Sequence, residues 1–229
     1  MLKLSKIISR LKSQANPKNV AGMARFGINP HNALGISIPD LRRLAKEIGK
    51  NHPLALELWD SDIHEARILA ALVAEAGQLT ENQMGSWVKD FDSWDICDQV
   101  CSNLFDKAPF AYDMAIKWVR DQREFVRRAG FVIMAALAVH DKKAADRRFI
   151  KFLPFLKKYS TDERNMVKKA VNWALRQIGK RNRALNRLAI KAGNEILASK
   201  DKTARWIASD ALRELKSPAV QKRLRKKCG

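Results

Sequence analysis

The chain has 229 residues, with 44 Lys and Arg against 24 Asp and Glu and a formal net charge of +20 at pH 7. Its 46% hydrophobic residues, 10 Gly and 7 Pro are typical of a folded protein and exclude a disordered, collagen-like or disulfide-stapled chain. No stretch approaches the ~18–20 uncharged apolar residues that a membrane-spanning helix needs, which excludes a spanning protein.

The positive charge is concentrated in the last third of the chain. Residues 1–146 hold 20 basic and 18 acidic side chains, a net charge of +2, whereas residues 147–229 hold 24 and 6, a net charge of +18. Such one-sided charge is typical of polyanion binders, because each neutralised phosphate releases a condensed counterion. A solvated surface and adsorption to a membrane stay open as alternatives, although adsorption favours one short polybasic tail.

The first segment, MLKLSKIISRLKSQ, is basic and amphipathic. Four apolar residues fall at helical spacing, namely Leu4, Ile7, Ile8 and Leu11. The apolar run is too short for the core of a secretion signal. We therefore expect a first helix here rather than a targeting segment.

The rest of the chain is predicted to be helical, because apolar residues recur at intervals of three and four and β-branched alternation is nearly absent. Breaks rich in Asn and Pro divide it into helices of roughly 10–18 residues joined by short turns. The breaks fall at Asn16-Pro17, Asn29-Pro30-His31-Asn32, Asn51-His52-Pro53, Ala108-Pro109, Leu153-Pro154 and Ser217-Pro218.

Five of the predicted helices recur about 30 to 41 residues apart, the range of two-helix HEAT-type repeats. They are HEARILAALVAEAG (64–77), WDICDQVCSNLF (94–105), FVRRAGFVIMAALA (125–138), MVKKAVNWALRQIG (166–179) and TARWIASDALREL (203–215). We expect an all-α fold, a right-handed α-solenoid of HEAT-like repeats in a single domain, residues 1–229. Its inner helices would line a basic concave groove. An irregular helical bundle is the alternative.

The densest candidate for chemistry is the segment DSWDICD, residues 92–98. Trp94 and Asp98 are four residues apart, so a helix places them on one side. Ser93 or Asp92 is suited to cap this helix, and Asp95 falls in its first turn, where negative charge is favoured. Such a capping pattern around a core tryptophan is the structural alternative. Asp98 fits it poorly, because a carboxylate followed by apolar residues needs a partner or a purpose.

Three cysteines make no even set for disulfides, and nothing resembles a secretion signal, so we expect a cytoplasmic location. Cys97 and Cys101 are spaced for a shared helix face, but no His lies near them in the sequence. We therefore interpret them as buried thiols rather than metal ligands, and Cys228 as unpaired. We expect no metal and no organic cofactor. No role is assigned to the four histidines, which are His31, His52, His64 and His140.

A second tryptophan, Trp173, lies in the basic segment VKKAVNWALRQ (167–177). The remaining four tryptophans are interpreted as structural; they are Trp59, Trp87, Trp118 and Trp206. Arg127 and Arg128 begin another helix, and we expect one to face solvent and the other a phosphate.

Several segments follow one another in a characteristic order: PKNVAGMARF (17–26), LGISIPDLRR (34–43), LWD (58–60), SWDICD (93–98), RRA (127–129) and KAVNWALR (169–176). In this order and spacing they resemble the AlkD-type DNA alkylation-repair glycosylases, which are built from HEAT-like repeats. The resemblance covers most of the chain.

The active cleft of that family holds one aspartate, two tryptophans and one arginine. The resemblance assigns these places to Asp98, to Trp94 and Trp173, and to Arg128. Phe26 stands where the family has a tyrosine, so the ring contact with DNA is kept and the hydroxyl is lost. The many basic residues of the last third go beyond the family pattern.

The resemblance implies a monofunctional glycosylase that excises cationic N3- or N7-alkylated purines from duplex DNA without flipping the base. Asp98 would stabilise the positive transition state and orient a water at C1′, while Trp94 and Trp173 flank the deoxyribose. The DNA backbone would be held by basic side chains, which are Arg127, Arg128, Lys168, Lys169, Arg176 and Lys180.

We expect a monomer that binds double-stranded DNA with alkylated purines, associates with the nucleoid when on DNA, and contacts no membrane. The alternative is a HEAT-repeat protein that recognises the structure of a nucleic acid without catalysis. A HEAT module that binds only proteins is a third reading, which a weak salt dependence of duplex binding would favour.

Overall fold

The computed structural model of the chain describes residues 3–226, so Cys228 lies outside the described residues. Within this range every regular element is a helix and no strand is present, which confirms the predicted all-α class. None of the described helices is long and apolar enough to cross a lipid bilayer. The backbone contacts divide the chain into two compact units, Met1–Pro109 and Phe110–Gly229, and the expected single domain stays a prediction.

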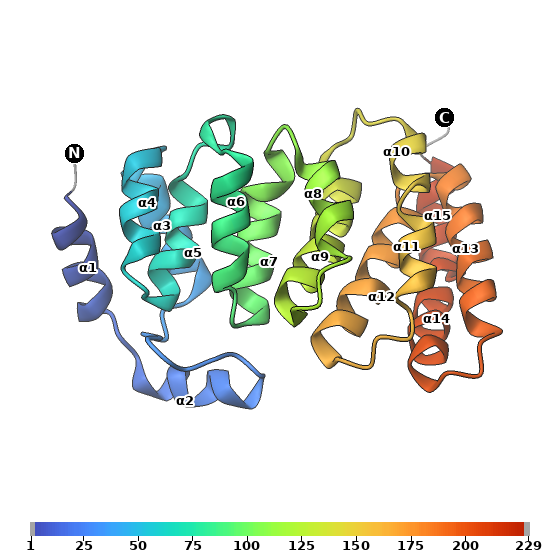
Figure 1. Cartoon of the computed structure of the whole chain (residues 1–229), viewed down its shortest axis with the longest axis horizontal. Helices are drawn as coiled ribbons and strands as arrows, with labels where there is room; N and C mark the ends of the chain where they lie inside the picture. Colours follow the sequence, from blue (N-terminus) through green and yellow to red (C-terminus); the bar gives the residue numbers. More distant parts are fainter. Residues whose placement is uncertain (1–2, 227–229) are drawn as a thin grey trace. The chain divides into compact units, whose positions relative to one another are not determined.

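The first unit is organised around α5 (Figure 1). Its α-helices are α1 (Leu4–Ser13), α2 (Pro17–Arg25), α3 (Ile38–Ile48), α4 (His52–Asp60), α5 (His64–Val73), α6 (Glu81–Trp87) and α7 (Trp94–Asn103). Short 3-10 helices lie between or after them, η1 (Ala76–Gln78), η2 (Val88–Asp90) and η3 (Phe105–Lys107). Because α5 packs against α3, α4 and α7, almost all of its side chains are buried. The expected first helix is present as α1, which buries Ile7 and Leu11.

The second unit is organised around α9 and α12. Its helices are α8 (Ala111–Trp118), α9 (Glu124–His140), α10 (Asp146–Ile150), α11 (Leu153–Lys158), α12 (Asn165–Gly179), α13 (Arg183–Leu197), α14 (Lys202–Leu215) and α15 (Pro218–Lys226). Helix α12 packs against both α9 and α14, and the three lie side by side (Figure 1). Helices α8 and α13 cover α9 and α14 respectively.

The five recurring segments of the sequence form α5, α7, α9, α12 and α14. Four of them pack against a helix that directly precedes them in the chain, as the pairs α4 with α5, α8 with α9, α11 with α12 and α13 with α14. The predicted two-helix repeats are therefore confirmed, while a basic groove along them stays a prediction.

The Asn-Pro breaks at residues 16–17 and 51–53 act as helix starts, whereas the break at residues 29–32 lies in the loop between α2 and α3. Asn16 accepts hydrogen bonds from two backbone N–H groups of the first turn of α2, and Asn51 caps α4 in the same way. Pro17 and Pro53 follow within the first turn, where a missing N–H costs no intrahelical bond. The sequence signal for these boundaries is local, which is why it is reliable.

Helix α9 approaches α8 so closely that one position admits only glycine. A β-carbon added at Gly130 would lie 2.7 Å from the Val119 backbone nitrogen and 2.8 Å from the Ala115 carbonyl oxygen. Both neighbours are backbone atoms, which cannot move aside as a flexible side chain does. The whole segment from Val126 to Ala138 is buried, so a separation of the two helices would open the core of this unit.

We therefore expect Gly130→Ala to lower the free energy of unfolding by about 1–3 kcal/mol, the usual cost of overpacking a core. Gly85→Ala is the matched control, because Gly85 lies in α6 and a β-carbon there meets nothing within 4 Å. The control should be neutral or stabilising by up to about 1 kcal/mol. Urea unfolding followed by circular dichroism measures both, and equal stabilities for the two variants would contradict the close packing.

Candidate functional site

The start of α7 displays Trp94 and Asp98 on one side, as their spacing predicts. The other side of this helix is apolar and buried against α5, and it includes both Cys97 and Cys101. Trp94 and Asp98 are half-buried. Both cysteines are buried thiols in the core, as predicted, and burial raises the pKa of the Cys101 thiol well above its usual value.

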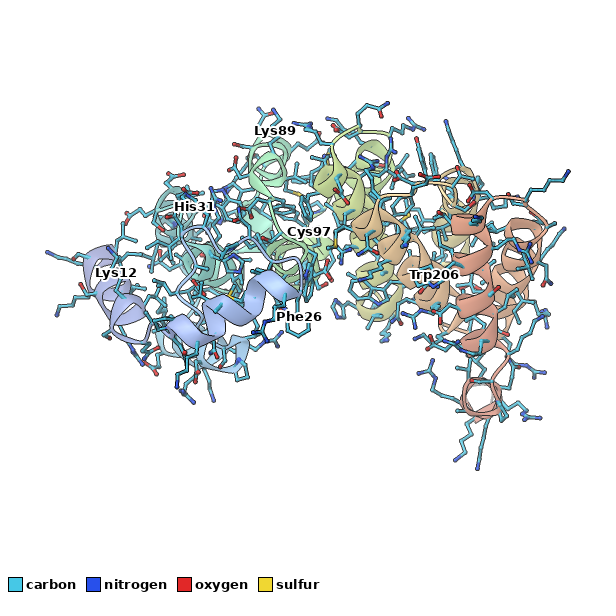
Figure 2. The ribbon with its side chains drawn as sticks, turned by 90° about the horizontal axis from the view of Figure 1, so that it is seen from below. Lys12, Phe26, His31, Lys89, Cys97 and Trp206 are labelled. Carbon is cyan, nitrogen blue, oxygen red and sulfur yellow. The ribbon has the colours of Figure 1, made fainter. Side chains whose placement is uncertain are left out.

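Three hydrogen bonds attach the loop after α2 to the start of α7. The Asn29 backbone N–H donates to Ser93 Oγ at 2.9 Å, and the Asn29 side-chain amide donates to Asp92 at 2.6 Å. The Trp94 indole N–H donates to the Phe26 carbonyl oxygen at 2.9 Å. Trp94 is therefore held by a polar bond that fixes its ring. The Phe26 ring itself is 73% exposed at the end of α2 (Figure 2).

The expected capping by Ser93 or Asp92 is wrong in its detail. Ser93 occupies the N-cap position of α7 but makes no side-chain cap. Its hydroxyl accepts the bond from Asn29 instead, and Asp92 accepts the second one. Sequence reasoning considered only neighbours along the chain, whereas the partner lies 64 residues away from Ser93.

A buried carboxylate holds the other end of the same loop. Glu65 is 1% exposed and accepts backbone N–H groups from Leu34 at 2.8 Å, Gly35 at 2.7 Å and Ile36 at 3.3 Å. Gly35 adopts a left-handed φ of 76°, which lets the consecutive N–H groups converge on the carboxylate. The loop that carries Phe26 and Asn29 is thus fixed at both ends.

A buried histidine links α5 to the first turn of α7. His64 Nε2 lies 2.8 Å from Asp95 Oδ2, and both side chains are largely buried. Burial opposes the charged imidazole, but the hydrogen bond and charge of Asp95, with Glu65 and Asp92 nearby, outweigh it and raise the pKa of His64. Asp95 therefore has a hydrogen-bonded imidazole partner in addition to the favourable helix dipole. The sequence analysis assigned no role to His64. The one sequence signal for this pair is the separation of its partners by 31 residues, which is one repeat length.

The two arginines at the start of α9 are both buried, at 9% exposure for Arg127 and 5% for Arg128. Arg127 pairs with Asp162 at 2.6 Å, donates to the Val119 carbonyl and lies over the Tyr159 ring. Burial raises the pKa of Asp162, but hydrogen bonds from Arg164 and Arg127 outweigh burial and lower it.

The expectation that one of these arginines faces solvent is therefore wrong, and Arg127 is a core ion pair rather than a surface contact for phosphate. Arg128 donates from Nη1 to the Met166 carbonyl oxygen at 2.6 Å and so joins α9 to the start of α12. The physical reason is tertiary packing, because Val119, Asp162 and Tyr159 enclose Arg127, and Arg128 is bonded to α12.

Helix α12 carries the other predicted basic residues and Trp173. Lys169 is exposed, and Trp173 is half-buried four residues later. Arg176 and Lys180 both pair with Glu214 of α14, at 2.7 and 2.6 Å. Burial raises the pKa of Glu214, but the hydrogen bonds and charges of Lys180 and Arg176 outweigh burial and lower it. The Glu214 carboxylate is therefore charged and offsets part of the positive charge of this surface.

Three of the four tryptophans interpreted as structural are core residues. Trp59, Trp87 and Trp118 are buried, and Trp59 stacks on Trp87 with ring centroids 4.1 Å apart. Trp206 contradicts that interpretation, because it is 44% exposed on α14. Lys168 lies over its ring, with Nζ 5.3 Å from the centroid.

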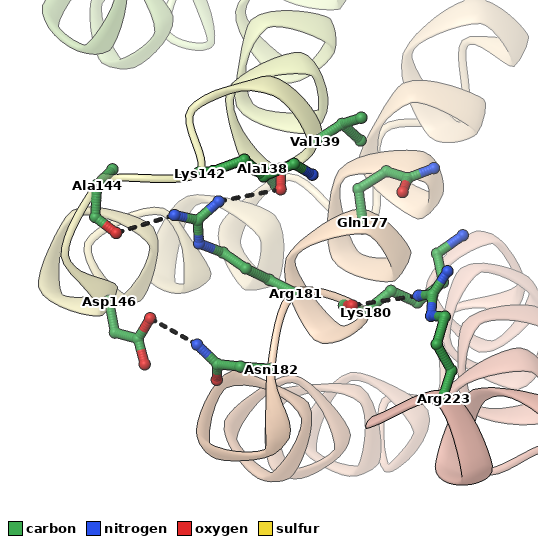
Figure 3. Close-up of a pocket in the computed structure, with 10 residues that line it drawn as sticks. All are labelled: Ala138, Val139, Lys142, Ala144, Asp146, Gln177, Lys180, Arg181, Asn182 and Arg223. Atoms are coloured by element: carbon green, nitrogen blue, oxygen red, sulfur yellow. Dashed lines mark hydrogen bonds between the residues drawn. The ribbon is translucent and has the colours of Figure 1, made fainter. Parts of the chain in front are cut away.

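A polar pocket of about 450 Å³ lies at the C-terminal ends of α9 and α12 (Figure 3). Arg181 donates to the carbonyl oxygens of Ala138 and Ala144, and Arg223 donates to that of Lys180. These guanidinium groups satisfy carbonyls at helix ends, a structural role. Of the predicted site residues only Lys180 lines this pocket. Across residues 3–226, no three His, Cys, Asp or Glu side chains gather as a metal-binding group.

Comparison with known proteins identifies the family. Residues 7–215 match the model of the family described as DNA alkylation repair enzyme. The chain belongs to this family. Its description places the chain among DNA-repair proteins, which agrees with the resemblance found in the sequence.

Two individual proteins extend the comparison. An uncharacterised protein of Listeria innocua, Lin0241, is 23% identical over 137 residues, which is 58% of this chain and 61% of that protein. The match thus spans less than two thirds of that relative.

A solved structure described as "a new family of proteins related to the HEAT-like repeat DNA glycosylases with affinity for branched DNA structures" superposes with a TM-score of 0.78 at 18% identity. It covers 97% of this chain and 96% of that one. This likeness confirms the predicted HEAT-like fold.

The raised pKa of His64 predicts a pH-dependent stability. An ordinary histidine titrates near pH 6.5. A higher pKa in the folded state gives a stabilisation that is fully present below about pH 6.5 and is lost as the pH rises through the folded-state pKa. We therefore expect His64→Gln to cost more stability at pH 5.5 than at pH 9. Chemical unfolding at both pH values measures the difference. Gln substitution at the exposed His31 is the control, and a pH-independent cost for His64→Gln would contradict the charged pair.

Proposed function

We propose that the chain is a monofunctional DNA glycosylase that hydrolyses the N-glycosidic bond of cationic N3- or N7-alkylated purines in duplex DNA. It would act as a monomer, without a metal or an organic cofactor. The observation that carries the proposal is the half-buried Asp98 one helical turn from Trp94, whose indole is fixed beside the exposed Phe26. A family of DNA-repair enzymes supplies the class of substrate.

Asp98 has the chemistry that this reaction requires. Alkylation makes the purine cationic, so it leaves as a neutral base with the electron pair of the C1′–N bond, and positive charge develops on the sugar. A carboxylate stabilises that charge and takes a proton from the water whose oxygen bonds to C1′. The products are a free alkylpurine and an abasic site. The mechanism uses no lysine nucleophile, so it leaves the strand intact.

The two tryptophans support the charge that develops on the sugar. An indole face attracts a cation by about 0.5–2 kcal/mol, the larger values applying where water is excluded. Trp94 is suited to this role because its N–H bond to Phe26 fixes the ring before DNA binds. Trp173 supplies a second indole from α12. The alkylated base is already a good leaving group, so the proposal requires no base flipping.

The DNA backbone would be held by the exposed cations of α12, with Phe26 as a ring contact. Lys168 and Lys169 lie two and three residues after Met166, whose carbonyl accepts the bond from Arg128. Arg128 would therefore position the start of α12 and also contact a DNA phosphate. Arg176 and Lys180 share one carboxylate, so together with Glu214 they contribute one net positive charge.

A DNA structure-binding protein without catalysis is the second candidate. Two observations favour it: both arginines at the start of α9 are buried, and the similar solved structure is described as having affinity for branched DNA. The carboxylate of Asp98 beside a fixed indole argues against this candidate, because a negative charge repels the DNA phosphates that a protein without catalysis would only bind. Excision of an alkylated base separates the two candidates.

We expect Asp98→Asn to slow release of 3-methyladenine and 7-methylguanine from methylated duplex DNA by about 100-fold or more. Affinity for the duplex should change by less than about threefold, because no phosphate contact is removed. Chromatography of the released bases and fluorescence anisotropy measure the two quantities. Asp60→Asn, an exposed carboxylate in α4, is the matched control and should behave as the wild type.

Two results would contradict the mechanism. Release at the wild-type rate by Asp98→Asn, or by Trp94→Ala combined with Trp173→Ala, would exclude the assigned residues. Absence of release by the wild-type protein would exclude the enzyme and leave the structure-binding candidate.

The shared carboxylate also makes a prediction about affinity. Glu214→Gln should raise duplex affinity and steepen the plot of log K against log salt by roughly one unit, because it removes the charge that Arg176 and Lys180 share. Lys169→Gln should flatten the plot by a similar amount. Glu195→Gln is the control, since Glu195 pairs with Lys157 at an exposed position. Equal changes for Glu214→Gln and Glu195→Gln would show a general charge effect.

A further inference from the structure

Trp206 is exposed where a tryptophan would ordinarily be buried. It is 44% exposed on the first half of α14 (Figure 2). Trp59, Trp87 and Trp118 lie in the core, and the Trp94 N–H is bonded to a carbonyl. The neighbours of Trp206 along α14, Ile207 and Ala208, supply the apolar packing of that turn. The indole is therefore available for a ligand without a role in the core.

Positive charge surrounds this indole. Lys168 Nζ from α12 lies 5.3 Å from the ring centroid. Two exposed cations, Lys202 and Arg213, lie on the same side of α14 as Trp206, four residues before it and seven after it, and the exposed Arg205 directly precedes it in the chain. Of the two acidic side chains on α14, Asp210 pairs with Arg213, and Glu214 pairs with Arg176 and Lys180. An exposed ring among cations is complementary to a ligand that carries both a flat π-system and negative charge.

A nucleotide in a single strand has both properties. Its base offers an uncovered face for stacking on an aromatic ring, and its phosphate offers the negative charge, which is the usual basis of single-strand binding. In an intact duplex the base faces are covered by neighbouring pairs, so an indole gains little there. A base stacked on Trp206 leaves the Lys168 ammonium close to the flanking phosphate.

We propose that Trp206 and Lys168 form a stacking site for an unpaired nucleobase of single-stranded DNA. The site goes beyond the proposed excision reaction, which acts on duplex DNA through Asp98 of α7. It gives the protein a means of binding DNA that contains an unpaired segment, such as a gap, a tail or an unpaired junction. Stacking tolerates any base, so the site selects for the absence of pairing rather than for sequence.

The test compares two DNA probes of equal length and charge. One is a fluorescein-labelled oligothymidine, and the other is a dumbbell duplex whose two ends are closed by hexaethylene glycol linkers, so that it contains no unpaired base. We expect Trp206→Ala to weaken binding of the single strand by about tenfold, the scale of one lost base stack. Dumbbell binding should change by less than about twofold. Trp206→Phe keeps a stacking ring and should retain most of the single-strand affinity.

Ile150→Ala is the matched control, because Ile150 is a similarly exposed apolar residue (42%) in the same unit. It should bind both probes as the wild type does, and thermal unfolding should show that all variants are folded. Unchanged single-strand affinity in Trp206→Ala would overturn the proposal. An equal loss on both probes, or an equal loss in Ile150→Ala, would overturn it too, since neither reports stacking.

The same variants separate this site from the proposed catalytic one. Trp206→Ala should excise alkylpurines from duplex DNA at the wild-type rate, and Asp98→Asn should bind oligothymidine with wild-type affinity. A protein that excises nothing yet loses single-strand binding in Trp206→Ala would keep the stacking site and reject the glycosylase. A protein that excises alkylpurines and keeps its single-strand affinity in Trp206→Ala would keep the glycosylase and reject the stacking site.

Discussion

A buried carboxylate holds the functional end of the first unit. Glu65 gives its carboxylate to three consecutive backbone N–H groups, from Leu34 to Ile36. Such a charge is costly to bury unless its lone pairs are satisfied, so the loop has one favourable position. That position brings Asn29 and Phe26 to the start of α7, where they bind Ser93 and Trp94. The orientation of the candidate indole therefore depends on a glutamate in another helix.

The second unit divides its cations between structure and surface. Arg127, Arg128 and Arg181 are used inside the protein, where they pair with a carboxylate or satisfy carbonyl oxygens. Exposed lysines, such as Lys169, remain for a partner. A planar guanidinium suits the structural role because it satisfies several acceptors at once. The net charge of the last third therefore overstates the charge available to bind DNA.

The fold could be predicted from the sequence because its signals are local. Helical periodicity, Asn-Pro starts and the recurrence of similar segments lie within a few residues or one repeat. The shared side of Trp94 and Asp98 follows from their spacing alone. The partners of Ser93, His64 and Arg127 could not be predicted, because each lies in another repeat and depends on tertiary packing. The exposure of Trp206 could not be predicted either, since composition cannot distinguish a core tryptophan from an exposed one.

Polar pairs between neighbouring repeats of the first unit share one separation. His52 with Gln83, Trp59 with Asp90, and His64 with Asp95 are each 31 residues apart. The members of a pair differ: the earlier repeat contributes a ring nitrogen and the later one a side-chain oxygen. Such pairs are directional, so exchanging the two repeats would leave buried polar groups unmatched. The pairs therefore specify the order of the repeats, which similar apolar helices alone would specify only weakly.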